Sequence, residues 1–413
     1  MKKILFLSAI DFKSKSIQVI RKTPEAFRNA GWHVDYIVAR DNISDGNYFY
    51  EEIINPEGIE VNRFRWRIEK MRASFKGVPR IILNKIASWL AIFDLYRYAK
   101  ESMRNTKYDV IYGYEYHGVL ALYLSLALKN RARRPFFVSR FQGTFYEGKL
   151  RSEKLLSLLF NFDHIFALSI KSDLIVMTDD GTMGDKFLRR LHQPLFLNKR
   201  MLFIANGVDI FENENKRNVQ HKASKSFSNN IDMVCLSRLV EWKKVERSIF
   251  LLDALLKLND DFIFNLTIIG GGPTEQKLKT LTQKLNLTNK VKFTGPLSNK
   301  AARQNLEEQD LFLSFYDESN VGNPLLEAFR ANLIPITLDN GTTSDWVTHN
   351  LTGLIYNPET LDFNLIAKDI ISLISDRNRY IKLKRNIKNL EDTKIRTWDE
   401  RFKIEIKMIE TNL

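Results

Sequence analysis

Short apolar runs alternate with segments of helical periodicity along most of the chain, and this alternation constrains the fold more than any other feature. Near the N-terminus, Ile4–Ser8 is an apolar run and Ile17–Ala30 has amphipathic spacing. The next apolar run is Val34–Ala39. A strand, a helix and a second strand in this order form a βαβ unit, which requires a parallel sheet. The sequence therefore predicts an α/β protein.

The alternation occurs in two series, separated by a polar stretch. Residues Glu212–Asn230 are rich in Asn, Lys, Ser and Glu, and we interpret them as a linker or loop. The further strands predicted before it are Asp109–Tyr112, Phe136–Ser139, Ile165–Leu168, Leu174–Thr178 and Met201–Ala205. The strands predicted after it are Met233–Ser237, Leu266–Ile269, Val291–Thr294, Leu311–Ser314 and Ile334–Leu338. The predicted helices between these are Val245–Leu258, Thr274–Leu285, Lys300–Gln309 and Pro324–Ala331.

Two series of this kind in 413 residues predict two doubly wound, Rossmann-like domains. We expect them at residues 1–212 and 228–396. A segment of helical spacing at about residues 397–413 follows, and this C-terminal helix can pack back on the first domain.

Composition excludes several classes of protein. Hydrophobic residues make up 44% and charged residues 27%, a mixture typical of globular proteins rather than of disordered chains. The single cysteine, Cys235, excludes a disulfide framework and a multi-cysteine zinc site, and its apolar strand predicts a core position. The apolar run at the N-terminus is interrupted by Asp11 and Lys13, and no stretch approaches the length of a membrane span. We therefore expect a cytoplasmic protein without a signal peptide.

The charge balance is strongly basic, with a formal net charge of +14. Such a surface favours nucleic acid, anionic lipid or phosphorylated ligands, and does not by itself choose among them. The charge is concentrated between Arg63 and Lys85, where only Glu69 opposes eight basic residues and aromatic residues are interleaved. The eight are Arg63, Arg65, Arg67, Lys70, Arg72, Lys76, Arg80 and Lys85.

Two interpretations of the Arg63–Lys85 segment are open. Basic amphipathic segments with aromatic residues are typical of proteins that lie on anionic membranes. The alternative is a helix packed on the sheet with a solvated charged face. The concentration of charge favours the first, which would place the protein peripherally on the inner face of the cell membrane.

The segment Ser314–Ala328 carries the most informative motif. It follows an apolar strand and leads into a helix, with Gly322 permitting close approach of a ligand and Pro324 suited to the first helical turn. We expect the N–H groups of Leu325 and Leu326 to point out of the helix N-terminus, where a phosphate binds favourably. A carboxylate at Glu327 can accept two ribose hydroxyls; alternatively it serves as a partner of the helix dipole.

A second motif, Ser237–Lys244, also follows a strand directly. Arg238 and Lys243 are five residues apart, and such a pair can neutralise a diphosphate leaving group. On its own the pair is a weak signal. A glycine-rich turn, Ile268–Pro273, comes soon after and predicts a close backbone approach, but it lacks the spacing of a dinucleotide fingerprint.

Together these motifs resemble the family-four retaining glycosyltransferases of the GT-B fold, also described as glycosyl transferases group 1. The resemblance rests on Arg238-Leu239 with Lys243, Gly270-Gly271-Gly272-Pro273, Gly295, Gly322-Asn323-Pro324-Leu325-Leu326-Glu327-Ala328, Asp339-Asn340-Gly341, Thr352-Gly353-Leu354-Ile355 and Asn206-Gly207-Val208-Asp209. These motifs occur in the family's order and cover most of the chain.

The resemblance implies a role for each matching position. Glu327 would hold the ribose, the amides of Leu325 and Leu326 would face the phosphates, and Arg238 and Lys243 would hold the diphosphate. It also implies transfer with retention and without a metal, from a UDP- or GDP-linked sugar and with no further cofactor. The residues expected to be catalytic are Arg238, Lys243, Glu327 and Glu318. Those expected to bind substrates are Ser319, Asn320, Gly322, Asn323, Leu325, Leu326, Gly271, Gln142, Ser16 and His117.

The sequence departs from the family's pattern at three places. Ser319 stands where the family has the first glutamate of its E-x7-E motif, so Glu318 or Asn320 would contact the sugar. Gln142 stands in place of a histidine that follows a strand in the first domain. Ser14-Lys15-Ser16 stands in place of the first glycine-rich loop and can still meet a phosphate at a helix N-terminus.

One more residue, His117, is a candidate for substrate binding because it follows a predicted strand. It is either a structural histidine, which we favour, or a residue lining the cleft.

The sequence thus predicts a retaining glycosyltransferase that moves a sugar from a nucleotide sugar to a glycan acceptor, which is lipid-linked or part of an envelope polysaccharide. One alternative is the same fold acting on a soluble sugar acceptor, and another is a sugar-nucleotide epimerase. A third is a non-catalytic basic protein that binds nucleic acid, which would account for the charge but leave the spacing of Arg238, Lys243 and Glu327 a coincidence. We expect no nucleic acid among the partners.

Overall fold

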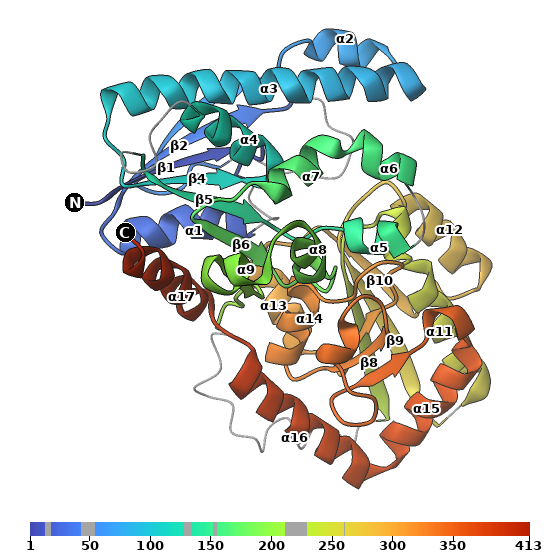
Figure 1. Ribbon diagram of the computed structural model, residues 1–413. Helices are drawn as coiled ribbons and strands as arrows, with labels where there is room; N and C mark the ends of the chain where they lie inside the picture. The colour runs from blue at the N-terminus through green and yellow to red at the C-terminus, as the bar shows by residue number, and fades with distance from the viewer. Residues whose placement is uncertain (13–17, 43–53, 128–133, 152–154, 211–228, 260) are drawn as a thin grey trace. The chain divides into compact units, whose positions relative to one another are not determined.

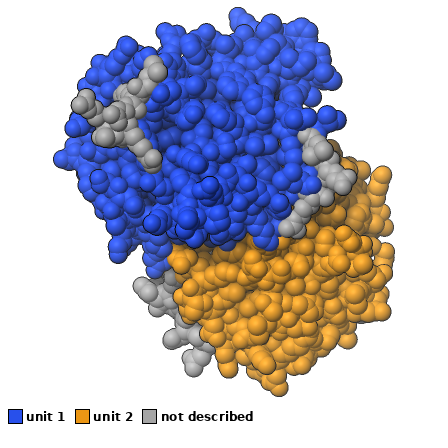
Figure 2. Space-filling view, viewed as in Figure 1, with its two compact units in different colours: residues 1–205, 399–413 blue, residues 206–398 orange. Residues whose placement is uncertain are grey.

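The structure, a computed structural model, describes residues 1–12, 18–42, 54–127, 134–151, 155–210, 229–259 and 261–413 (Figure 1). The chain divides into two compact units (Figure 2). Unit 1 comprises residues 1–205 and 399–413, and unit 2 comprises residues 206–398.

Unit 1 is built on a parallel sheet of seven strands in the order β3-β2-β1-β4-β5-β6-β7. The strands are β1 Lys3–Ser8, β2 His33–Arg40, β3 Glu60–Arg65, β4 Val110–Tyr114, β5 Phe136–Phe141, β6 Leu174–Thr178 and β7 Met201–Ile204. The order reverses between β1 and β4, and open sheets of this kind bind ligands outside the carboxyl ends of the strands near such a reversal.

Helices cover both faces of this sheet. Its helices are α1 Gln18–Asn29, α2 Glu69–Ser74, α3 Gly77–Asn105, α4 Glu115–Leu126, α5 Tyr146–Arg151, α6 Leu155–Phe160, α7 Phe162–Ser169, α8 Gly184–Leu191, α9 Pro194–Arg200 and the C-terminal α17 Trp398–Thr411. In Figure 1, α3 and α4 lie over one face, and α1 and α17 lie over the other. The position of α17 is fixed by buried polar contacts, because Tyr112 in β4 donates its hydroxyl to Glu405 Oε1 at 2.6 Å.

Unit 2 is built on a second parallel sheet, in the order β10-β9-β8-β11-β12-β13. Its strands are β8 Asn230–Leu236, β9 Ile263–Ile269, β10 Val291–Gly295, β11 Leu311–Ser314, β12 Ile334–Leu338 and β13 Leu354–Tyr356. Its α-helices are α11 Glu246–Leu258, α12 Glu275–Lys284, α13 Asn299–Glu307, α14 Asn323–Arg330, α15 Phe363–Ser375 and α16 Arg377–Lys394, with 3-10 turns η3 Glu241–Lys243, η4 Thr343–Asp345 and η5 Pro358–Thr360. The two doubly wound domains predicted from the sequence are confirmed, and Cys235 is buried in β8 as expected.

Two sequence-based expectations in unit 1 were wrong. Ile165–Leu168, expected to be a strand, lies in α7 with Ala167 and Leu168 buried. A run of four apolar residues does not distinguish a strand from a turn of a half-buried helix. The edge strand β3 was not predicted, because its sequence EVNRFR is mostly polar and charged and none of its residues is fully buried. In the part of the chain that the structure describes, no helix has the length and apolar composition of a membrane span.

Candidate functional site

Four loops at the carboxyl edge of the unit 2 sheet are bonded to one another. The loop after β8 donates the Leu239 N–H to Gly271 O, in the loop after β9, at 3.0 Å. The loop after β11 donates the Asp317 N–H to Trp242 O at 3.0 Å. Asn340, after β12, donates its side-chain amide to Tyr316 O at 2.5 Å. Parallel strands end at the same edge, so motifs that are far apart in sequence form one framework there.

The glycine-rich turn after β9 supports the loop that carries Arg238. Gly270 and Gly272 have φ of 140° and 156°, which side-chain-bearing residues rarely adopt. A Cβ at Gly270 would lie 1.8 Å from Ser237 O, and one at Gly272 would lie 2.3 Å from Leu239 O. The close approach predicted for this turn is therefore an approach to the neighbouring loop, in which Gly271, predicted to bind substrate, accepts the Leu239 N–H.

Lys243 is positioned by two aromatic rings. Its Nζ lies 4.0 Å from the centre of the Trp242 ring and 3.6 Å from that of Tyr316. The Tyr316 ring is itself buried and donates its hydroxyl to Leu236 O at 3.2 Å. Cation–π contacts of this kind hold a positive charge at a fixed place without neutralising it. The loop after β8 thus presents two cationic residues, Arg238 and Lys243, at the edge of the sheet.

The loop between β11 and α14 contains Glu318, Ser319 and Asn320, the residues at and beside the position of the family's first glutamate. Their side chains have different surroundings. Asn320 accepts the Tyr316 N–H at 2.9 Å and donates to Leu338 O at 3.1 Å, and it is almost fully buried. Both ends of its amide hold the loop, and the contact with the sugar expected of Glu318 or Asn320 stays a prediction. Ser319 is buried and accepts the Val321 N–H at 3.2 Å. Glu318 is the exposed carboxylate of the three.

The N-terminus of α14 differs from the expectation in one respect. Leu326 donates its N–H to Gly322 O at 3.2 Å, the first regular helical hydrogen bond, and Leu325 donates to the same oxygen at 3.0 Å. Neither amide is therefore free for a phosphate, because the helix begins one residue earlier than the position of Pro324 indicates. Gly322 is the N-cap residue and Asn323 the first helical residue, so their N–H groups precede the first turn.

Glu327 lies one turn into α14 and is 9% exposed. The residues on either side of it, Leu326 and Ala328, are fully buried, and they fix the orientation of the helix on the sheet. The carboxylate therefore has a position determined by packing.

Of the predicted substrate-binding residues in unit 1, His117 packs inside the domain. It is buried, its Nε2 lies 3.0 Å from Ser88 Oγ, and its ring packs against Tyr116 and Trp66. Burial lowers the pKa of this imidazole well below its ordinary value. The structural role favoured from the sequence is therefore confirmed. Gln142 donates its side-chain amide to the Tyr114 hydroxyl, and Ser16 lies outside the described residues.

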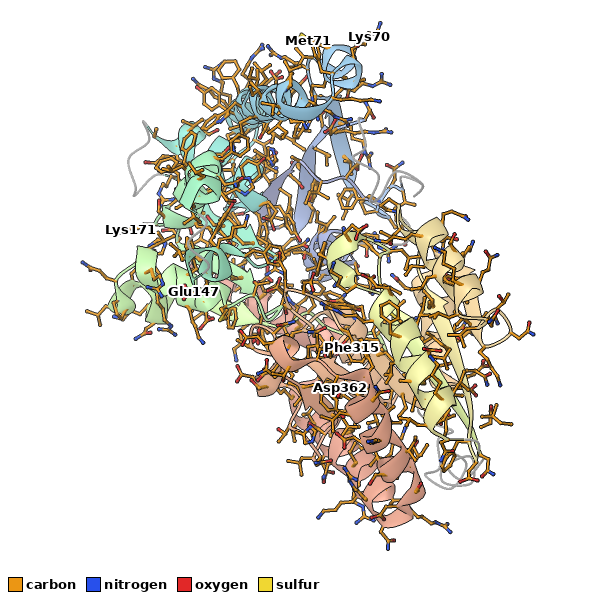
Figure 3. The ribbon with its side chains drawn as sticks, turned by 90° about the vertical axis from the view of Figure 1, so that its right-hand side faces the viewer. Lys70, Met71, Glu147, Lys171, Phe315 and Asp362 are labelled. Atoms are coloured by element: carbon orange, nitrogen blue, oxygen red, sulfur yellow. The ribbon has the colours of Figure 1, made fainter. Side chains whose placement is uncertain are left out.

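Unit 1 contains a cavity of about 270 Å³ between the carboxyl edge of its sheet and α7. Its lining combines aromatic rings with a few polar groups: Glu115, Tyr116, Phe141, Gly143, Thr144, Phe145, Tyr146, Lys149, Asn161, His164 and Leu168. Glu147, labelled in Figure 3, is not part of this lining and pairs with Arg190 at 2.8 Å, which attaches α5 to α8. Apolar pockets with a few convergent polar groups are typical of ligand sites.

Two carboxyl groups with raised pKa values meet at this edge. Burial raises the pKa of Glu115 to about 7, although the Gln142 N–H donates to its Oε1 at 2.7 Å. Burial likewise raises the pKa of Asp180, which accepts from Thr182, to about 7. Glu115 also has φ of 54°, and left-handed backbone at a residue other than glycine is concentrated at functional sites.

The imidazole of His164, also in the cavity, is stacked on Tyr116 with ring centres 3.6 Å apart. Burial lowers its pKa to about 4, so the ring is neutral near pH 7. It can therefore donate or accept a hydrogen bond to an uncharged hydroxyl without adding charge to the cavity.

Comparison with known proteins identifies part of the chain. Residues 216–390 match the sequence model of the family described as glycosyl transferases group 1. This segment belongs to that family. The match covers the four loops at the carboxyl edge of unit 2, including the motifs around Arg238 and Glu327, and it confirms the resemblance inferred from them.

The solved structures that resemble the whole chain share its fold. Sucrose-phosphate synthase from Thermosynechococcus elongatus has a TM-score of 0.72 at 15% identity, with 100% of this chain and 98% of that chain covered. HepE from Anabaena, in complex with UDP and glucose, has a TM-score of 0.64 at 17% identity, with both chains covered completely. The chain therefore has the GT-B fold.

A curated relative of the group 1 segment is a GDP-mannose-dependent alpha-(1-6)-phosphatidylinositol monomannoside mannosyltransferase of Mycobacterium tuberculosis. It is 28% identical over 158 residues, which are 37% of this chain and 40% of that protein. The alignment thus spans less than half the length of that curated relative.

Sequence reasoning missed Glu115 and His164 as candidate site residues. Glu115 had a usable signal, since it directly follows a strand in Tyr114-Glu115-Tyr116. His164 had none, because it directly precedes Ile165–Leu168, the run that was interpreted as a strand. In the part of the chain that the structure describes, no group of His, Cys, Asp or Glu residues is arranged to hold a metal ion.

Proposed function

We propose that this protein is a retaining glycosyltransferase that moves a sugar from a UDP- or GDP-linked donor to a glycan acceptor. One observation carries the proposal: Arg238, Lys243 and Glu327 stand on bonded loops and a helix at one carboxyl edge, inside the group 1 segment. Ligands of open α/β sheets bind at this edge.

The donor diphosphate would lie between the loop after β8 and the N-terminus of α14. Arg238 and Lys243 would contact its oxygens, and the N–H groups of Gly322 and Asn323 would meet it with the positive end of the helix dipole. Glu327 would accept the ribose hydroxyls. Glu318 is our candidate for the contact with the transferred sugar, because it is an exposed carboxylate, whereas the neighbouring exposed carboxylate, Asp317, pairs with Arg247 at 2.8 Å.

In the proposed step the bond between the sugar C1 and the diphosphate oxygen breaks, and a bond from C1 to the acceptor oxygen forms on the same face. The acceptor hydroxyl gives its proton to the departing phosphate oxygen, so charge and atoms balance. The cationic side chains would stabilise the negative charge that develops on the diphosphate, which is the role we propose in place of a metal ion.

The acceptor would bind in unit 1, in the cavity lined by Glu115 and His164. Its aromatic rings offer apolar faces to the C–H groups of a sugar ring, and its polar side chains match hydroxyl groups. The similarity of the group 1 segment to a mannosyltransferase whose acceptor is a phosphatidylinositol mannoside supports a lipid-linked acceptor. We propose that the reaction takes place at the cytoplasmic face of the membrane.

The test is turnover of nucleotide sugars by three variants. Lys243→Ala and Arg238→Ala should each lower kcat by about 10²–10³-fold, since lost stabilisation of developing charge costs about 2.7–4 kcal/mol. Glu327→Ala should weaken nucleotide affinity as well as turnover. Lys277→Ala is the matched control, because Lys277 is an exposed lysine of the same unit and its pair with Glu241 is exposed too. Turnover and affinity at the level of this control in all three variants would refute the assignment.

A further inference from the structure

Helix α3 has two apolar faces, and unit 1 covers only one of them. Ala87, Ala91 and Leu95 are fully buried against the domain. On the other side, apolar side chains recur every three or four residues and are between 36% and 67% exposed: Val78, Ile82, Ile86, Trp89 and Phe93. This spacing places them in one row along the helix.

The row continues onto neighbouring helices. Met71 of α2 and Phe75, which directly follows α2, are exposed near the start of α3, and Figure 3 shows Met71 and Lys70 at one end of unit 1. Farther along α3, the Trp89 ring is stacked on the ring of Phe162 in α7, with ring centres 6.0 Å apart. Four further apolar side chains of α6 and α7, at positions 156, 159, 160 and 166, are exposed there, with Leu156 at 83%.

We call this surface the apolar face. It consists of Met71, Phe75, Val78, Ile81, Ile82, Ile86, Trp89, Phe93, Leu156, Leu159, Phe160, Phe162 and Phe166. Surfaces of this extent on a single domain mark interaction sites.

The charge on this surface is smaller than the sequence indicates. Four of the eight basic residues between Arg63 and Lys85 are in ion pairs: Arg63 with Asp11, Arg67 with Asp94, Arg72 with Asp41 and Lys85 with Asp163. Arg72 is only 2% exposed. Of the other four, Arg65, Lys70 and Lys76 are exposed and Arg80 is half-buried.

The sign of the remaining charge is uniform. From Lys70 to Phe93 the sequence contains no Asp or Glu, and Leu155–Phe162 contains no charged residue. The apolar face therefore carries no carboxylate over these stretches, the first of which lies between Glu69 and Asp94.

We infer that the apolar face docks on an anionic lipid bilayer. This inference rests on the proposed function, since it places the enzyme on the surface that holds a lipid-linked acceptor. Apolar and aromatic side chains enter the headgroup boundary, while lysines at the edge extend their amines to anionic headgroups. A protein partner would be expected to meet a rim of both signs, which these stretches do not offer.

The structure also changes the expected balance of forces. Half of the basic residues between Arg63 and Lys85 are paired within the protein. Insertion of the apolar side chains therefore provides most of the attraction between protein and bilayer. The three exposed cations make that attraction stronger for anionic lipid. Salt should therefore weaken the docking only in part, because screening acts on the charged groups and not on apolar burial.

The test is co-sedimentation of the full chain with vesicles of phosphatidylcholine containing 30% phosphatidylglycerol. The apolar variant combines Ile82→Ser, Ile86→Ser and Leu159→Ser, and its control combines Leu195→Ser, Leu351→Ser and Leu365→Ser, which change equally exposed residues elsewhere. The charge variant combines Arg65→Gln, Lys70→Gln and Lys76→Gln. Its control combines Lys382→Gln, Lys403→Gln and Lys407→Gln, three exposed lysines distant in sequence.

We expect the apolar variant to bind vesicles at least tenfold more weakly than the wild type and the charge variant three- to tenfold more weakly. Each control should stay within twofold of the wild type. Equal binding by the wild type and the apolar variant overturns the inference, as does a wild type that does not bind. A wild-type dimer that ignores vesicles and becomes monomeric in the apolar variant would instead identify a second copy as the occupant.

UDP and GDP affinity, measured on the same proteins, keeps the two proposals separate. Wild-type nucleotide affinity in the apolar variant shows that unit 2 is folded. Vesicle binding without any nucleotide binding would leave the docking surface intact and contradict the proposed function instead.

Discussion

At the residue scale, Glu115 links the cavity of unit 1 to a measurable dependence of stability on pH. Its pKa is raised to about 7 in the folded protein by burial, so between about pH 4.5 and 7 the folded state binds a proton more tightly than the unfolded state. Stability from this group is present at low pH and is lost as pH rises through 7. Glu115→Gln should therefore raise the free energy of unfolding at pH 8 by about 1–3 kcal/mol relative to the wild type, and much less at pH 4.5.

Urea denaturation at several pH values measures this difference. Part of the dependence of the unfolding free energy on pH should persist in Glu115→Gln, because burial also raises the pKa of Asp180 to about 7. Glu359→Gln, at an exposed glutamate, serves as the control and should behave as the wild type does at each pH. A difference between Glu115→Gln and the wild type that does not change with pH would contradict the raised pKa.

At the scale of elements, helix α17 depends on a buried group of charges. Arg401 and Glu405 in α17 and Arg140 in β5 are fully buried, and Arg401 pairs with Glu405. The two guanidinium groups, together with the hydrogen bond from Tyr112, lower the pKa of Glu405 despite its burial. Glu405→Gln leaves two buried positive charges without their carboxylate, so we expect it to lower the free energy of unfolding by about 3–5 kcal/mol.

The same helix supplies the control for this prediction. Glu410 pairs with Lys2 at 2.9 Å, and both side chains are largely exposed, so Glu410→Gln should change stability by less than about 1 kcal/mol. Both variants are compared by urea denaturation at pH 7. If Glu405→Gln and Glu410→Gln lower the free energy of unfolding by the same small amount, the buried charges around Glu405 do not stabilise the position of α17.

At the scale of the whole molecule, the net charge of +14 must be reconciled with the proposed use of a nucleotide sugar. A ligand that binds only the folded state at 100 times its Kd stabilises it by about 2.7 kcal/mol. UDP or GDP should therefore raise the Tm measurably at 0.15 M salt. A 20-mer oligonucleotide should not, because non-specific attraction to phosphates falls steeply with salt. Stabilisation by the oligonucleotide alone would favour the nucleic-acid-binding alternative.

The sequence by itself determined the two α/β units and the edge of the second sheet at which the candidate donor motifs gather. Strand and helix periodicities are local, and parallel strands bring every loop at their carboxyl ends to one edge, so motifs such as Ser237–Lys244 and Ser314–Ala328 were predictable as neighbours. The family resemblance followed from the same local motifs. Local pattern failed in α7, where it was ambiguous, and in β3, where it was polar.

Only the tertiary structure decided how charges and polar groups are used, because pairing and burial depend on residues distant in the chain. Lys85 meets Asp163, 78 positions away, and Arg72 meets Asp41, 31 positions away; these contacts turn an apparently basic segment into a mainly apolar face. Glu115 acquires its raised pKa from burial beside Gln142 and Asp180, which follow two other strands. Desolvation of a carboxyl group is set by everything packed around it, and no local pattern records that environment.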